Sequence, residues 1–197
     1  MADSTVQLAS NALRMIGADP ITALTDDNDR ARVMDALYTP TLDAMIQMHN
    51  WNFAQRRVAL AALTAVPVWG YGQMFQLPQE PFCLQVLETN LETDQAWRIE
   101  TYATATASYR VLLTDASAVS ILYLARITDP SLYPGLFSRA FEYELAYLAS
   151  YPLTRNAQLR EALRADKELA WQKAKSRDAQ ESRTLKTITS TAFTGVR

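Results

Sequence analysis

The residues best suited to chemistry lie in one short stretch, residues 49–54 (HNWNFA). His49 is the single histidine of the chain, and histidine is the side chain that most readily exchanges a proton near neutral pH. A catalytic histidine needs an orienting group, and no Asp or Glu lies close to it in sequence. Trp51 and Phe53 alternate, so in extended chain both face one side, where burial contributes about 2–3 kcal/mol each. We therefore predict that His49, Trp51 and Phe53 form a structural hinge at the end of a helix.

Other reactive side chains do not form a recognisable catalytic set. The single cysteine, Cys83, lies in an apolar stretch and is expected to be buried. Glu142 and Glu144 are two residues apart in a predicted helix, so they point in different directions. The sequence has no phosphate-binding glycine loop, nucleophile elbow or two-histidine metalloprotease motif. It therefore predicts no enzyme activity, catalytic residue, cofactor or metal site.

Composition favours one domain, or one domain with an appendage. The chain has 197 residues, of which 49% are hydrophobic, enough for a substantial core. No apolar run reaches the roughly 18 residues that would span a bilayer, and the first residues do not resemble a signal peptide. We expect no membrane partner, and a protein made in the cytoplasm.

Charge is distributed unevenly along the chain. Residues 1–154 carry nine Arg, no Lys and sixteen Asp or Glu, a net charge of −7, whereas residues 155–197 carry ten Lys or Arg and five Asp or Glu, a net charge of +5. This asymmetry predicts either a C-terminal region that meets an acidic partner or a solvated helix with a frayed end. The acidic remainder argues against wrapping by DNA, which requires neutralised phosphates.

Helical patterns occupy both ends of the chain. Ser4 can cap a first helix that ends at Gly17, and residues 25–29 (TDDND) suit the start of a second helix that contains Pro40. Pro134 suits the start of a third helix, which Pro152 should close. Thr154 should then cap a last helix, whose apolar face weakens toward its end: Leu159, Leu163, Ala170 and Ala174. We expect the end of that helix to project from the body.

The middle of the chain has strand patterns. Residues 75–78, 84–87, 97–102 and 109–114 are predicted to be extended, while residues 58–63 suit strand or helix. Residues 119–127 are apolar on both faces, which suits a central strand or a buried helix. A preceding hairpin-like spacing favours the strand. The predicted fold is α+β and mainly helical. A helical bundle built from both chain ends carries a small antiparallel β region at about 75–127 within an adaptor domain, residues 1–182.

The last residues have a composition of their own. Residues 184–194 contain five threonines and one serine, and β-branched residues favour extended chain. Ile188 and Phe193 are apolar anchors in this stretch. We interpret residues 183–197 as an extended C-terminal docking arm that adds to a partner's surface, with an ordinary unstructured terminus as the alternative.

The order of these motifs resembles the head-to-tail adaptor proteins of tailed bacteriophages, in particular the tail tubular protein A family of short-tailed phages. The resemblance covers most of residues 5–165, and each motif alone is weak. One departure lies at residues 78–82, where the acidic residue that the family places soon after its Leu-Pro pair is displaced. The matching segments, in order, are Asn11-Ala12-Leu13, Ile16-Gly17-Ala18, Ile21-Thr22, Leu24-Thr25-Asp26, residues 49–54, Arg57, Trp69-Gly70-Tyr71, Phe75-Gln76-Leu77-Pro78, Cys83-Leu84-Gln85-Val86, residues 123–129, Phe137, residues 145–149 and Pro152-Leu153-Thr154.

The resemblance implies a structural virion protein located at the head–tail interface. Such adaptors form a ring, usually dodecameric, beneath the portal protein. They extend the DNA channel, through which double-stranded DNA passes without sequence-specific binding, and they provide the platform for a distal tail or nozzle protein. The family's C-terminal region commonly engages the portal, which makes the following residues candidates for portal docking: Lys173, Lys175, Arg177, Lys186, Ile188 and Phe193.

Three other functions remain open from the sequence. A tail-associated peptidoglycan hydrolase would require a pair of carboxylates that the sequence does not single out. A stand-alone DNA-binding module would require a salt-dependent interaction that the acidic residues 1–154 oppose. A connector of a long-tailed phage or gene-transfer particle would differ only in its partners.

Overall fold

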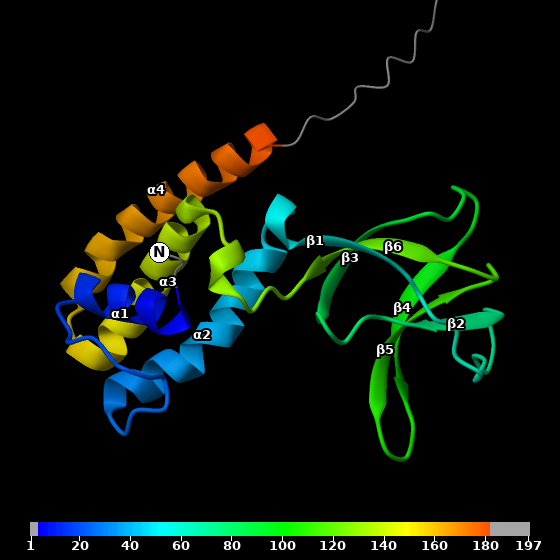
Figure 1. Cartoon of the computed structure of the whole chain (residues 1–197), viewed down its shortest axis with the longest axis horizontal. Coiled ribbons are helices and arrows are strands. Elements are labelled where there is room, and N and C mark those ends of the chain that lie inside the picture. Colours follow the sequence, from blue (N-terminus) through cyan, green and yellow to red (C-terminus); the bar gives the residue numbers. More distant parts are fainter. Residues whose placement is uncertain (1–3, 182–197) are drawn as a thin grey trace, which may run out of the picture.

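The computed structural model describes residues 4–181, in which a helical bundle and a β region lie side by side (Figure 1). The bundle contains α1 (Thr5–Met15), α2 (Asp29–Gln47), α3 (Gly135–Thr154) and α4 (Ala157–Glu181). Six strands lie between α2 and α3 in the sequence, so the bundle is built from both ends of the chain. The predicted α+β, mainly helical class is therefore confirmed. The predicted C-terminal arm, residues 183–197, lies outside the described residues.

The first two helices begin and end at the expected signals. The Ser4 hydroxyl accepts a hydrogen bond from the Gln7 backbone N–H at 3.1 Å, and Gly17 adopts a φ of 75° just after α1. Asn28 caps α2 by accepting from the Ala31 N–H at 2.9 Å. Asp26 instead accepts from the Thr22 and Ala23 N–H groups, which holds the preceding turn and lowers the pKa of its carboxyl.

The connection between α3 and α4 differs from the sequence prediction in two ways. Pro152 does not close α3, because the helix continues to Thr154 and ends where Arg155 adopts a left-handed φ of 55°. Thr154 does not cap α4 either: its hydroxyl donates back to the Ser150 carbonyl at 2.7 Å. Asn156 is the cap, since its side-chain oxygen accepts from the Gln158 and Leu159 N–H groups.

The β region begins earlier than predicted, at Gln55. One three-stranded antiparallel sheet has the order β1-β6-β3 and the other the order β2-β5-β4. The strands are β1 (Gln55–Ala59), β2 (Gln73–Gln76), β3 (Cys83–Thr89), β4 (Trp97–Ala103), β5 (Ser108–Thr114) and β6 (Ser120–Ala125). Residues 119–127 thus contain a strand, as the pattern favoured. Of the ambiguous residues 58–63, only Val58 and Ala59 belong to β1.

The chain after β1 links the two sheets. The Leu60 N–H donates to the Val119 carbonyl at 2.9 Å, beside β6, and the Leu63 N–H donates to the Met74 carbonyl of β2 at 2.8 Å. Ala62 also forms an isolated bridge with Phe75. The two sheets are therefore continuous through residues 60–63. Apolar side chains of both sheets belong to the same core as the helices, including Phe75, Leu112 and Tyr123.

The segment from His49 to Ala54 joins the bundle to β1, but it is not extended as predicted. Residues Asn52–Ala54 form a short 3-10 helix, η1. Trp51 and Phe53 nevertheless meet the same partner, because their ring centroids lie 4.9 and 4.7 Å from that of Phe137 in α3. The short 3-10 helix therefore places both aromatic rings against α3, so the two side chains share a partner although the backbone is not extended.

Candidate interaction surfaces

The structure gives His49 a carboxylate partner that the sequence did not indicate. His49 Nε2 lies 3.0 Å from Asp178 Oδ2, across 129 residues of chain. The other oxygen of Asp178 accepts from the Asn52 backbone N–H at 3.0 Å, and the His49 ring packs edge-on against Trp51 at 4.7 Å. Each carboxylate oxygen thus contacts a group of the α2–β1 link. This arrangement holds the α2–β1 link against α4.

Other candidates for chemistry are also engaged in structural contacts. Glu142 accepts from Asn11 of α1 at 2.6 Å, whereas Glu144 pairs with Lys167 of α4 at 3.0 Å, so the two carboxylates do point in different directions. Cys83 is buried, as predicted, and burial raises the pKa of its thiol to about 11 despite the nearby Arg110. Within residues 4–181 no group of three or more His, Cys, Asp or Glu side chains could hold a metal ion.

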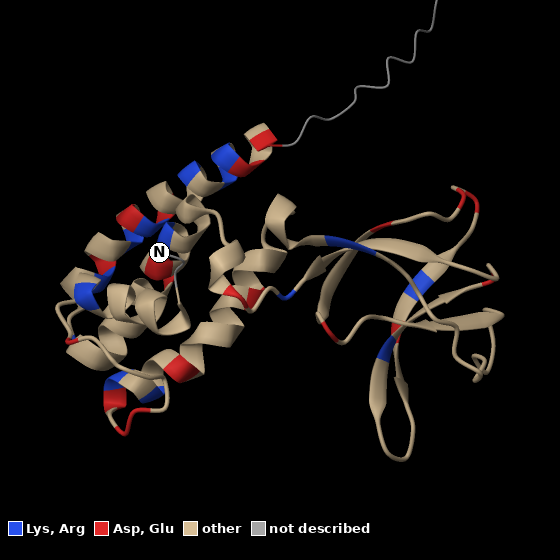
Figure 2. Ribbon diagram, in the orientation of Figure 1, with Lys and Arg blue, Asp and Glu red and all other residues tan. Residues whose placement is uncertain are grey.

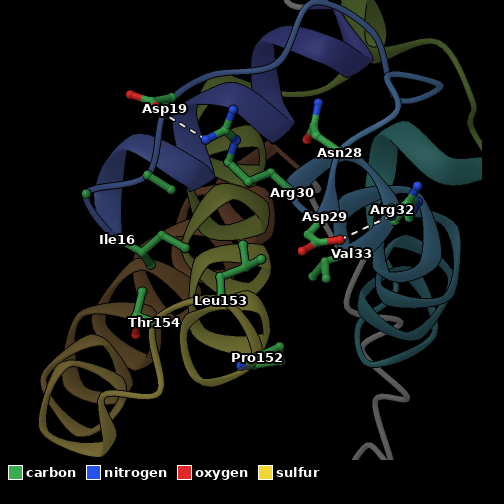
Figure 3. Close-up of a pocket in the computed structure, with 12 residues that line it drawn as sticks. Ile16, Asp19, Asn28, Asp29, Arg30, Arg32, Val33, Pro152, Leu153 and Thr154 are labelled. Atoms are coloured by element: carbon green, nitrogen blue, oxygen red, sulfur yellow. Dashed lines mark hydrogen bonds and ion pairs between the residues drawn. The ribbon is translucent and has the colours of Figure 1, made fainter.

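A pocket of about 750 Å³ lies where the end of α1, the start of α2 and the end of α3 meet (Figure 3). Its cationic side chains are paired with carboxylates: Arg30 contacts Asp19 at 3.0 Å, and Arg32 contacts Asp29 at 3.2 Å. Figure 3 shows both pairs across the pocket wall. The Arg30–Asp19 pair ties the loop between α1 and α2 to the bundle, whereas the Arg32–Asp29 pair lies within the first turn of α2. Both guanidinium groups thus have an acidic partner.

A second hollow, of about 590 Å³, lies on the outer face of the β2-β5-β4 sheet. Its apolar floor includes Met74, Val111 and Leu113, and one wall is the loop that precedes β2. That loop leaves large apolar side chains in solvent: Val66 is 64% exposed, Val68 100% and Trp69 86%. Because a protein surface seldom displays such a cluster without a partner, we regard this apolar loop, residues 66–69, as a candidate contact surface.

Pro67, Gly70 and Gly72 predict irregular chain around Trp69, but we did not predict a contact surface there. A usable signal was present, since residues 58–79 contain no charged side chain. Such an uncharged stretch suits either a buried strand or an exposed apolar contact. Only the fold separates these possibilities: the strands at its two ends are paired in sheets, while the loop between them stays exposed.

The described portal-docking candidates lie near the end of α4. Lys173 and Arg177 are exposed, and the Lys175 ammonium lies 5.4 Å from the centre of the Trp171 ring. Lys186, Ile188 and Phe193 lie outside the described residues. Along α4, six Lys or Arg alternate with five Asp or Glu (Figure 2). The basic excess of the C-terminal region therefore comes mainly from Arg155 and the residues after Glu181.

The end of α4 is exposed except at one residue, which makes contacts that the sequence did not predict. Asp178 is only 6% exposed, and its contacts with His49 and Asn52 hold this turn against the α2–β1 link. The weak apolar face beyond Ala174 had suggested a free end, but a polar contact replaces apolar burial there. The helical turn that contains Asp178, three residues before the end of α4, is therefore held against the bundle.

Comparisons with known proteins add no identification. No protein-family model matches the chain, and no curated protein matches its sequence. None of the helices in the described part of the chain has both the length and the apolar character needed to cross a membrane.

Proposed function

We propose that this chain is a structural subunit of a phage head-to-tail adaptor ring. In this proposal it binds beneath the portal, extends the DNA channel and provides the platform for a distal tail protein. The proposal has the ordered sequence motifs as its first support. Its structural support is that the two candidate contact surfaces lie on different parts of the molecule. The charged end of α4 belongs to the bundle, while the apolar loop belongs to the β region (Figures 1 and 2).

The separation of these two features carries the proposal, because a connector must contact a component on each side. The end of α4 and the residues that follow would face the portal, with Lys173, Lys175 and Arg177 as contacts. The apolar loop around Trp69 would face a neighbouring subunit or the distal tail protein. Aromatic side chains such as tryptophan often dominate the affinity of protein interfaces. The acidic excess of residues 1–154 would suit a channel, since like charge reduces adhesion of passing DNA.

The experiment that tests this function is native mass spectrometry of the full chain with and without portal rings. We expect a complex that contains several copies of this chain per portal ring, and the number of copies gives the symmetry. Truncation to residues 1–181 should leave the fold intact and weaken that complex. A full-length chain that stays monomeric in the presence of portal, with its circular dichroism unchanged, would contradict the proposal. Turnover of purified peptidoglycan would instead favour the hydrolase.

A further inference from the structure

The last two turns of α4 contain one buried charged residue among exposed neighbours. Asp178 is 6% exposed, whereas Arg177, Ala179 and Glu181 are exposed. Burial of a carboxylate is unfavourable unless hydrogen bonds compensate for the lost water. Its position therefore requires specific partners.

These partners all come from the link between α2 and β1. Asp178 Oδ1 accepts from the Asn52 backbone N–H at 3.0 Å, and Oδ2 lies 3.0 Å from His49 Nε2. In return, the Asn52 side chain donates to the main-chain carbonyl of Asp178 at 2.7 Å. Three contacts thus join one residue of α4 to two residues of the only covalent connection that enters the β region from α2.

The apolar contacts between α4 and the α2–β1 link stop short of this attachment, at Trp171 and Ala174. Trp171 and Ala174 lie on the same helical face as Asp178, seven and four residues earlier, and the Trp171 ring packs 5.4 Å from that of Trp51. From Lys175 to Glu181, however, the helix buries no side chain except that of Asp178. The end of α4 therefore depends on polar contacts for its position.

We propose that Asp178 is a positioning residue, which fixes the C-terminal end of α4 on the α2–β1 link and so sets the position of Glu181, the last residue of the helix. The contacts also make the two segments interdependent: whatever stabilises the end of α4 protects the Asn52 N–H, and disturbance of residues 49–52 releases the helix end. The consequence for portal docking rests on the proposed function. The attachment itself is a property of the free chain.

Amide hydrogen exchange of the full-length free chain tests the attachment. In Asp178→Ala we expect exchange at residues 175–181 and at Asn52 to accelerate about tenfold or more, because hydrogen bonds to a charged group are lost. Exchange in α1 should not change. Asp178→Asn keeps an oxygen for the Asn52 N–H and should restore much of the protection. Asp166→Ala, at an exposed carboxylate on the same helix, is the matched control and should behave as wild type.

A second variant covers the case in which Asp178→Ala unfolds the whole chain. Asn52→Ala removes only the bond to the Asp178 carbonyl, and it should accelerate exchange at residues 178–181 without affecting α1. Wild-type exchange at residues 175–181 in either folded variant would overturn the inference. Portal protein is absent from the exchange measurement. Wild-type exchange in these variants would therefore overturn the attachment without bearing on portal binding, and a chain that does not bind portal would leave the attachment intact.

Discussion

Arg126 donates two hydrogen bonds to Asp43, one from Nε to Oδ1 at 2.7 Å and one from Nη2 to Oδ2. This bidentate pair connects the chain just after β6 to the C-terminal part of α2. Both side chains are partly screened from solvent, and the guanidinium also lies 4.9 Å from the centre of the Phe82 ring. Asp43 and Arg126 therefore join the bundle to the β region at a second point, separate from the contacts of Asp178.

The first prediction concerns this pair. Arg126→Ala should lower the free energy of unfolding by about 2 kcal/mol, because Asp43 loses a bidentate partner and Phe82 loses a stacked group. Arg126→Lys should recover only part of the loss, since an ammonium cannot form the two parallel bonds. Urea denaturation followed by circular dichroism measures both. The exposed pair of Arg98 with Glu100 provides the control: Arg98→Ala should change stability by less than about 0.5 kcal/mol.

Trp51 is the subject of the second prediction. Its ring is 1% exposed, and its indole N–H donates to the Met45 carbonyl at 2.8 Å. Replacement by Ala should cost about 3–5 kcal/mol through the cavity that it leaves, while Phe should cost less because it still contacts Phe137. Thermal unfolding of both variants provides the measurement. Equal stability of Trp51→Ala and the wild type would show that the α2–β1 link is not packed as described.

A third prediction follows from the raised pKa of Cys83. The folded chain holds the thiol proton to about pH 11, whereas an unfolded chain releases it near its ordinary pKa of 9.0. Between these values the folded state binds more protons, so stability must fall as pH rises. The loss from this group should be about 2–3 kcal/mol across that range. Burial raises the pKa of Tyr38 to about 12, which adds to the effect at higher pH.

Denaturation curves between pH 7 and 11 test this directly. In Cys83→Ala the decline from pH 9 to 11 should be smaller than in the wild type, although the variant starts from a lower stability. The native thiol should also react slowly with iodoacetamide at pH 8, because little thiolate is present. Rapid alkylation of folded protein would contradict the burial of Cys83.

The fourth prediction separates the two proposed contact surfaces. Trp69→Ser alters a side chain that is 86% exposed, so the free energy of unfolding should change by less than about 0.5 kcal/mol. We expect the variant to bind portal but to lose contacts with neighbouring subunits or the distal tail protein. Truncation after residue 181 should have the opposite pattern. Leu169→Ser, at another exposed apolar residue, serves as the control in a pull-down with each partner.

Local signals in the sequence determined the elements of the fold. Ser4 and Gly17 mark the first helix correctly because capping depends on hydrogen bonds between near neighbours. The apolar residues of β6 suited either a buried strand or a buried helix, and the preceding hairpin-like spacing correctly favoured the strand. The prediction that Pro152 closes the third helix was wrong. A proline near the C-terminal end does not stop a helix at once, and α3 continues to Thr154 before the left-handed Arg155 ends it.

Only the tertiary structure determined which distant residues meet. The partner of His49 is Asp178, and no sequence pattern relates positions 129 residues apart. The same limit applies to Trp69, since an uncharged stretch has the same composition whether it is covered or exposed. Helix and strand preferences arise from interactions within a few residues, whereas the attachment of α4 and the exposure of the apolar loop arise from how completed elements pack. The sequence alone therefore established the fold class, and packing decided where its surfaces and attachments lie.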